Sequence, residues 1–195
     1  MNRAAFLDRD GVINRKAPVG QYLTRWEEIQ MLPGVAQAIR LFNRAGYLVI
    51  VVTNQRSVAK GLISVSELED IHHRMCEELA RTGATVHEVY YCPHELEPAC
   101  SCRKPQPGML LRAAHTHNID LSVSWIIGDS DLDVEAGKNA GCRTVRLVES
   151  DEPDNEKADA VASSLLEATL KILQLDGGIA HRTASGAVHD SPGIS

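Results

Sequence analysis

In the stretch Phe6-Leu7-Asp8-Arg9-Asp10-Gly11-Val12-Ile13-Asn14, near the start of the chain, a short apolar run ends in two carboxylates and a glycine. This run, which begins at Ala4, predicts a buried strand that ends in a charged turn. Open α/β sheets bind their ligands at the carboxyl ends of strands. Two acids this close repel each other unless a cation lies between them, which favours a hard metal ion such as Mg²⁺. An isolated acidic turn is also common on protein surfaces. Further motifs are therefore needed to distinguish a metal site from a solvated turn.

Apolar runs and amphipathic stretches alternate along the rest of the chain. Residues 47–52 are continuous, apolar and β-branched, which is typical of a parallel strand buried on both faces. Further strands are predicted at 86–91, 123–128, 143–148 and, as a brief edge, 160–161. Helices are predicted at 34–46, 65–81, 109–117, 134–140 and 165–173. The alternation predicts an α/β fold, a doubly wound and mainly parallel sheet with helices on both faces.

The length of 195 residues fits one ordinary domain with a tail. Residues 12–32 lack a helical period and predict a flap or irregular loop over the end of the first strand. Neither this gap nor the one after Thr53 has room for a large cap domain. We therefore expect a single domain over 1–175 and a loose tail over 176–195, where small residues show no period. Two histidines on the predicted second helix, His72 and His73, are expected at ordinary surface or semi-buried positions.

Charge and hydropathy exclude several partners. The net charge of -6 argues against a nucleic-acid binder, and no basic run indicates a membrane-surface patch. The chain shows no signal sequence at its start and no apolar run of membrane-spanning length, so we expect a cytoplasmic protein. No long exposed apolar stripe is left over, which favours a monomer.

Three of the five cysteines lie within residues 92–102, which we call the zinc loop. They form the pattern Cys92-x-His94-(five residues)-Cys100-x-Cys102. Three thiolates and one imidazole make a closed tetrahedral set suited to structural Zn²⁺, with no position left for water. Zinc would order a loop that cannot fold by itself, and it would fix the cationic residues that follow the last ligand.

Polar residues also lie at four places along the chain that we expect at the ends of strands. They are Asp8 with Asp10, Thr53 with Asn54, Arg103 with Lys104, and Asp129 with Asp133. A parallel sheet brings such residues into one crevice. A nucleophilic carboxylate, a hydroxyl, an ammonium and a metal-binding acid pair are together what phosphoryl transfer to an aspartate requires.

Through these motifs the chain resembles the haloacid dehalogenase superfamily of aspartate-nucleophile phosphatases. The resemblance covers about residues 3–148 and implies a Rossmann-like core. It implies that Asp8 attacks phosphorus and forms a phosphoaspartate. It also implies that Asp10 protonates the leaving oxygen and then activates water.

The same resemblance assigns the remaining site residues. Thr53 and Lys104 would hold the phosphoryl group. Asp8, Asp129 and the carbonyl of Asp10 would bind Mg²⁺. Asp133 would support Lys104 or the metal site.

The zinc loop, Thr53-Asn54-Gln55 and Cys102-Arg103-Lys104-Pro105 resemble one branch of that superfamily, which contains D-glycero-D-manno-heptose 1,7-bisphosphate phosphatases and histidinol-phosphate phosphatases. The branch implies removal of the 7-phosphate of a small soluble sugar bisphosphate, for synthesis of surface-polysaccharide precursors. Arg103 would then hold the second phosphate, because its planar fork suits that anion. The substrate-facing residues would further include Asn54, Gln55 and Arg56.

Alternatives stay open at this point. A histidinol-phosphate phosphatase would need acids for the substrate ammonium, which Glu95 and Glu97 could supply. A non-catalytic binding module and a DNA-end 3′-phosphatase are less favoured. Two departures from the branch also stand out: Arg56-Ser57 replaces a more familiar Ser-Gly pair, and Ser130 stands where Lys is frequent after the metal-binding Asp.

Overall fold

The strands form one central sheet. In the computed structural model, which describes residues 1–148 and 157–184 with the side chains of 178–184 left aside, six parallel strands have the order β3-β2-β1-β4-β5-β6. Their bounds are β1 (Arg3–Leu7), β2 (Tyr47–Asn54), β3 (Glu88–Cys92), β4 (Trp125–Gly128), β5 (Arg143–Leu147) and β6 (Ala160–Ala162). All neighbouring strands pair in parallel, so their carboxyl ends lie at one edge of the sheet. The predicted parallel sheet is confirmed.

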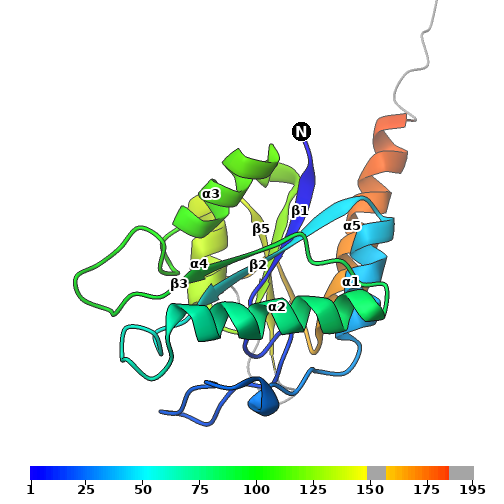
Figure 1. The fold of residues 1–195 in the computed structure, drawn as a ribbon. Coiled ribbons are helices and arrows are strands. Elements are labelled where there is room, and N and C mark those ends of the chain that lie inside the picture. Colours follow the sequence, from blue (N-terminus) through cyan, green and yellow to red (C-terminus); the bar gives the residue numbers. More distant parts are fainter. Residues whose placement is uncertain (149–156, 185–195) are drawn as a thin grey trace, which may run out of the picture.

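Helices cover both faces of this sheet (Figure 1). Their bounds are α1 (Val35–Arg44), α2 (Val65–Arg81), α3 (Gly108–His117), α4 (Asp131–Ala140) and α5 (Leu165–Ala184). Apolar residues of α1, α2 and α5 share one core cluster, and those of α3 and α4 share another. The doubly wound α/β arrangement is therefore confirmed.

The central strands supply both halves of the core. Successive residues of a strand point to opposite faces, so Leu7 of β1 packs toward α1 and α5 while Phe6 packs toward α3 and α4. Both side chains are fully buried. Burial of each contributes about 1.5–3 kcal/mol, which makes β1 a rigid base for the residues that follow it.

Short loops connect the strands to the helices near the site. The segment between β1 and α1, which we call the flap (residues 12–34), contains one 3-10 turn at Trp26–Glu28 and a bridge between Asn14 and Met31. The loop from β2 to α2 spans residues 55–64. In the described part of the chain, neither of these segments contains a large cap domain, which agrees with the prediction.

The last helix is longer than predicted. It continues past Leu173 to Ala184, so the backbone is helical over residues 176–184, where the sequence predicts the start of a loose tail, and residues 185–195 lie outside the described residues. The carboxylate of Asp176 accepts a hydrogen bond from Arg143 at 2.6 Å and one from the Trp125 indole at 3.4 Å. These contacts fix the helix to the sheet although its hydrophobic period fades. None of the helices in the described part of the chain is long and apolar enough to cross a membrane.

Candidate active site

Polar residues converge at the carboxyl edge of the sheet. Asp8 follows β1 directly, and its N–H donates to the carbonyl of Ile127 in β4 at 3.0 Å. Because β1 lies between β2 and β4, residues that end these strands come close to Asp8. The predicted site residues linked by contacts at this edge are Asp8, Asp10, Thr53, Asn54, Gln55, Lys104, Asp129 and Asp133.

The side chain of Lys104 is buried at the centre of this group. Its Nζ lies 3.0 Å from Asp8 Oδ1 and 2.5 Å from Asp133 Oδ1, and it donates to the Val52 carbonyl at 2.8 Å. Burial alone would lower the pKa of the ammonium, but the charges of Asp133 and Asp8 outweigh burial and raise this pKa. Lys104 therefore stays charged and places a fixed positive charge beside Asp8.

Asp8 is buried among like charges. Burial raises the pKa of its carboxyl to about 7, against the lowering effect of Lys104. This value includes the raising effect of three neighbouring carboxylates, which are Asp133, Asp10 and Asp129. A cation among these carboxylates would favour the ionised form that a nucleophile needs.

Two polar residues brace Lys104 and its partner. The Asn54 amide donates to the Lys104 carbonyl and accepts from the Lys104 N–H, both at 3.1 Å. Ser130, the N-cap of α4, donates its hydroxyl to Asp133 Oδ2 at 2.5 Å and its N–H to the same oxygen at 3.1 Å. This geometry favours a positioning role for Asn54 over the predicted substrate contact. It also gives Ser130 a role in holding Asp133.

Donors surround both oxygens of Asp10. The Arg9 guanidinium donates to them through Nε at 3.1 Å and Nη2 at 2.9 Å, and the amides of Asn14 and Gln55 each donate at 2.9 Å. Burial raises the pKa of Asp10, but the charge of Arg9 and these hydrogen bonds outweigh burial and lower it. Asp10 is therefore ionised and held in one orientation in the free site.

Gln55 and Thr53 are both buried, with exposed fractions of 4% and 1%. The Gln55 amide that contacts Asp10 also donates to Thr53 Oγ1 at 3.0 Å. Because this oxygen accepts from Gln55, the Thr53 O–H can donate to a bound group. The burial of Gln55 favours positioning of Thr53 and Asp10 over the predicted contact with substrate.

Behind Asp10 lie two buried residues that the sequence prediction missed. Arg9 is 1% exposed, and its Nη1 lies 3.1 Å from Nε2 of His72, which is 5% exposed. Burial first, and the charge of Arg9 second, lower the pKa of His72 to about 3, so the imidazole is neutral. The expected surface or semi-buried position is therefore wrong for His72. One signal was present, because His72 follows the inward-facing Leu68 by four residues.

Three carboxylates can hold a metal ion. Oxygens of Asp8, Asp129 and Asp133 lie within 4.8 Å of one another. Oδ1 of Asp129 is buried without a hydrogen-bond partner, while its carboxylate pairs with Lys16 of the flap. Gly11, at φ +89°, leaves room for Asp129, because a Cβ there would lie 1.8 Å from Oδ2. The partnerless oxygen of Asp129 and the carboxylate of Asp8 fit Mg²⁺, which prefers oxygen ligands, whereas the two oxygens of Asp133 already bind Lys104 and Ser130.

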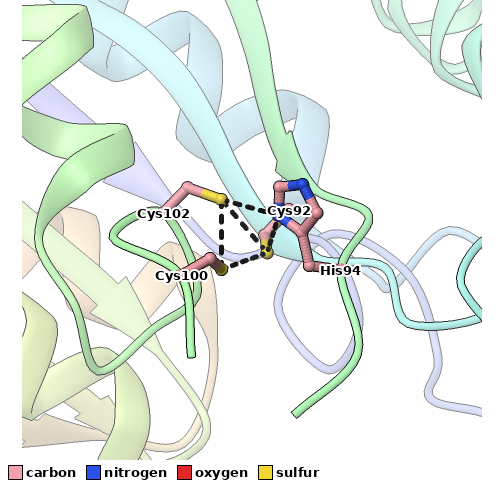
Figure 2. Close-up of side chains that lie close together, drawn as sticks. All are labelled: Cys92, His94, Cys100 and Cys102. Atoms are coloured by element: carbon pink, nitrogen blue, oxygen red, sulfur yellow. Dashed lines mark hydrogen bonds between the residues drawn. The ribbon is translucent and has the colours of Figure 1, made fainter. Parts of the chain in front are cut away.

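The four predicted ligands of the zinc loop lie together (Figure 2). The contacts among the sulfurs of Cys92, Cys100 and Cys102 and Nδ1 of His94 are 3.2–3.6 Å long. A tetrahedral zinc site with bonds of about 2.0–2.3 Å has edges of roughly 3.3–3.8 Å. Burial raises the pKa of the Cys102 thiol, and a cation held among the three sulfurs would favour its thiolate. The donor set and its spacing fit a structural zinc ion.

The predicted substrate arginines both contact the zinc loop. Arg103 donates from Nη1 to the His94 carbonyl at 3.4 Å. Arg56, in the loop after β2, forms an ion pair with Glu95 and so joins that loop to the zinc loop. Glu95 is therefore already paired with a cation, which makes it a weaker candidate for binding the ammonium group of histidinol phosphate.

The fold and the site define a haloacid dehalogenase-like hydrolase, and residues 101–168 match the family described as HAD-hydrolase-like. The D-glycero-β-D-manno-heptose-1,7-bisphosphate 7-phosphatase of Rhodopseudomonas palustris is 46% identical over 71% of this chain and 79% of that protein. The enzyme of the same name from Pasteurella multocida is 35% identical over 92% and 99% of the two chains. The protein belongs to the family of D-glycero-D-manno-heptose-1,7-bisphosphate 7-phosphatases.

Solved structures agree with this placement. The D,D-heptose 1,7-bisphosphate phosphatase from B. bronchiseptica superimposes with a TM-score of 0.80 at 32% identity. The match covers 89% of this chain and 99% of that one, and that structure is a complex with magnesium and phosphate. The resemblance stated from the sequence is thus confirmed at the level of family and fold.

Proposed function

We propose that this protein is a magnesium-dependent phosphatase that removes the 7-phosphate of D-glycero-D-manno-heptose 1,7-bisphosphate, in the synthesis of surface-polysaccharide precursors. The observation that carries the proposal is the 3.0 Å pairing of Asp8 with the buried ammonium of Lys104. Beside this pair, Asp129 has a buried oxygen without a partner, suited to a cation. The names of the relatives support the choice of sugar.

The phosphoryl group is transferred first to the protein. A carboxylate oxygen of Asp8 attacks phosphorus, the bond from phosphorus to the sugar oxygen breaks, and a phosphoaspartate forms. The Lys104 ammonium and the Thr53 hydroxyl hold the phosphoryl oxygens in this step. When bound by Asp8, Asp129 and the Asp10 carbonyl, Mg²⁺ would supply further positive charge for those oxygens.

Asp10 handles the protons of both steps. It gives a proton to the departing sugar oxygen and then takes one from the water that hydrolyses the phosphoaspartate. Asp10 is ionised in the free site, so its proton must arrive together with the substrate. The negative phosphate favours this uptake, because a like charge nearby raises the pKa of a carboxyl group.

The second, non-reacting phosphate needs a cation of its own. Arg103 is the candidate, because it follows the last ligand of the zinc loop and offers a planar fork of donors. Arg56 can add to this charge only by giving up its pairing with Glu95. We therefore propose Arg103 as the main anchor and Arg56 as an auxiliary one.

Zinc has a structural role in this proposal. The four ligands of the zinc loop leave no open position for water, so the ion would take no part in the chemistry. Lys104 follows Cys102 by two residues, and the ordered loop would therefore hold both Lys104 and Arg103 at the site.

Further features of the enzyme are part of the same proposal. We expect one catalytic domain that includes residues 1–175 and the described end of α5, acting as a monomer in the cytoplasm. The net charge of -6 supports a small-molecule substrate over a nucleic acid.

The test is phosphate release by the purified protein with Mg²⁺ from both anomers of heptose 1,7-bisphosphate and from histidinol phosphate. Asp8→Asn is the blank, because its amide cannot act as the nucleophile. The proposal would be supported if kcat/KM for one heptose anomer exceeded kcat/KM for histidinol phosphate by at least about 100-fold, or roughly 2.7 kcal/mol. A preference for histidinol phosphate would overturn the sugar assignment, and an inactive wild type would favour a non-catalytic binding module.

A further inference from the structure

A buried histidine that takes no part in the steps above reaches the site through Arg9. His72 lies on α2, and its Nε2 is 3.1 Å from Nη1 of Arg9. The other two guanidinium nitrogens, Nε and Nη2, donate to the two oxygens of Asp10. All three nitrogens of this buried guanidinium therefore have partners, and His72 supplies one of them.

The imidazole is itself fixed in place. Its ring packs against Tyr91 of β3 with the centroids 5.5 Å apart, and the Tyr91 hydroxyl donates to Glu69 at 2.8 Å. The imidazole is neutral in the buried site, so Nε2 can accept the hydrogen bond from Arg9. The charged and titratable groups around His72 are thus Arg9 and Asp10 on one side and Tyr91 and Glu69 on the other.

We propose that His72 is a positioning residue for the acid–base carboxylate, because it anchors the Arg9 guanidinium whose fork orients Asp10. This inference rests on the proposed role of Asp10. Without an acceptor at position 72, Nη1 of Arg9 would be a buried donor with no partner. The guanidinium would rotate toward another acceptor. Its two hydrogen bonds to the oxygens of Asp10 would then be lost, and Asp10 would no longer be held in one orientation.

A disturbed Asp10 has a specific kinetic consequence. Protonation by Asp10 matters for a sugar or other alkyl leaving group, whose oxygen is strongly basic, and much less for p-nitrophenolate. A defect in orienting Asp10 therefore slows transfer from alkyl phosphates more than transfer from p-nitrophenyl phosphate. A general loss of structure would slow both.

The experiment measures single-turnover phosphoryl transfer to Asp8 from heptose 1,7-bisphosphate and from p-nitrophenyl phosphate, together with kcat and KM. His72→Leu is expected to slow the first reaction by about 10-fold or more and the second by less than about 3-fold, with KM nearly unchanged. His72→Gln keeps an acceptor and is expected to stay close to wild type. His73→Leu is the matched control, because its side chain is 71% exposed on the same helix.

Equal slowing of both substrates, no slowing at all, or an equal effect of His73→Leu would overturn the inference. If His72→Leu does not fold, His72→Asn takes its place, because the shorter amide cannot reach Arg9. If the wild type cleaves p-nitrophenyl phosphate and glucose 6-phosphate but not the heptose, only the sugar assignment fails, and the leaving-group comparison is made with glucose 6-phosphate. A wild type that is inactive on every phosphate would overturn both proposals.

Discussion

The ammonium of Lys16, on the flap, pairs with the carboxylate of Asp129, whose Oδ1 is buried without a hydrogen-bond partner. Lys16 thus places a positive charge beside the carboxylates proposed to bind Mg²⁺. Its side chain is 51% exposed and long enough to withdraw toward solvent when a metal ion binds. A metal ion and the Lys16 ammonium would therefore compete for the same carboxylate.

Replacement of Lys16 by Met should strengthen the binding of Mg²⁺. The ion would no longer compete with the ammonium for Asp129 or be repelled by it, and we expect a 3- to 10-fold lower Kd, or about 1 kcal/mol. Isothermal titration of the metal-free protein measures this directly. Lys138→Met, which removes an exposed lysine of α4, is the control and should leave the Kd unchanged. Weaker binding to Lys16→Met would contradict the competition.

Stability should fall in mild acid because of His72. Its folded pKa of about 3 lies below the unfolded value of about 6.5, so the unfolded chain binds the extra proton between these limits. The stabilisation is present above pH 6.5 and is lost as the pH falls, at up to about 1.4 kcal/mol per pH unit.

Urea unfolding at pH 6.5 and pH 5.0 tests this sign. His72→Gln should lose roughly 1–2 kcal/mol less than wild type between the two values, since it carries no titrating group at this position. Carboxylates and metal ligands are common to both proteins and cancel in the difference. His73→Gln is the control, and an identical pH dependence in wild type and His72→Gln would exclude a buried neutral imidazole.

Removal of zinc should disable the enzyme without touching the nucleophile. Cys100→Ser is expected to lose the bound zinc, to lower the Tm, and to reduce kcat on the order of 10-fold or more as Lys104 and Arg103 lose their fixed places. Elemental analysis gives the zinc content, and Cys76→Ser on α2 is the control that should keep the metal.

A chelator separates the two metals in the same experiment. After treatment with EDTA, Mg²⁺ alone should fail to restore activity, whereas Mg²⁺ with Zn²⁺ should restore it. Full recovery with Mg²⁺ alone would count against the zinc site.

The parts of the site that could be predicted from sequence share a simple geometry. Asp8 and Asp129 each follow a buried parallel strand, and such strands end at one edge of a sheet. The ligands of the zinc loop lie within eleven residues, so their spacing is visible in the sequence itself. The positions of such residues can be predicted because they depend on the local sequence and not on contacts with distant parts of the chain.

Side chains whose partners lie far along the chain were harder to predict. Asn54 binds the backbone of Lys104, 50 residues away, and Gln55 binds Asp10, 45 residues away. A polar residue at a strand end can face the substrate or a neighbouring loop, and its sequence position does not distinguish the two. The length of α5 was missed for the same reason, because the partners of Asp176 are residues of distant strands.

Gly11 provides the sharpest test of the metal site. Its φ of +89° is strained for any other residue, and a Cβ would lie 1.8 Å from Asp129 Oδ2. Gly20, at φ +81° in the flap, has no atom within 4 Å of such a Cβ. Alanine at either position should therefore destabilise the fold similarly, by about 1 kcal/mol, through its backbone strain.

Only Gly11→Ala should also displace Asp129, and we expect it to weaken Mg²⁺ binding and to lower kcat/KM on the order of 100-fold. Thermal unfolding, metal titration and phosphate release on the two variants separate these effects. Because the control carries the same kind of strain, a loss of metal binding confined to Gly11→Ala must come from the crowding of its Cβ against Asp129 and the Lys16 side chain paired with it. Normal metal binding by Gly11→Ala would mean that Asp129 can move away without cost, and would remove Asp129 from the proposed magnesium ligands.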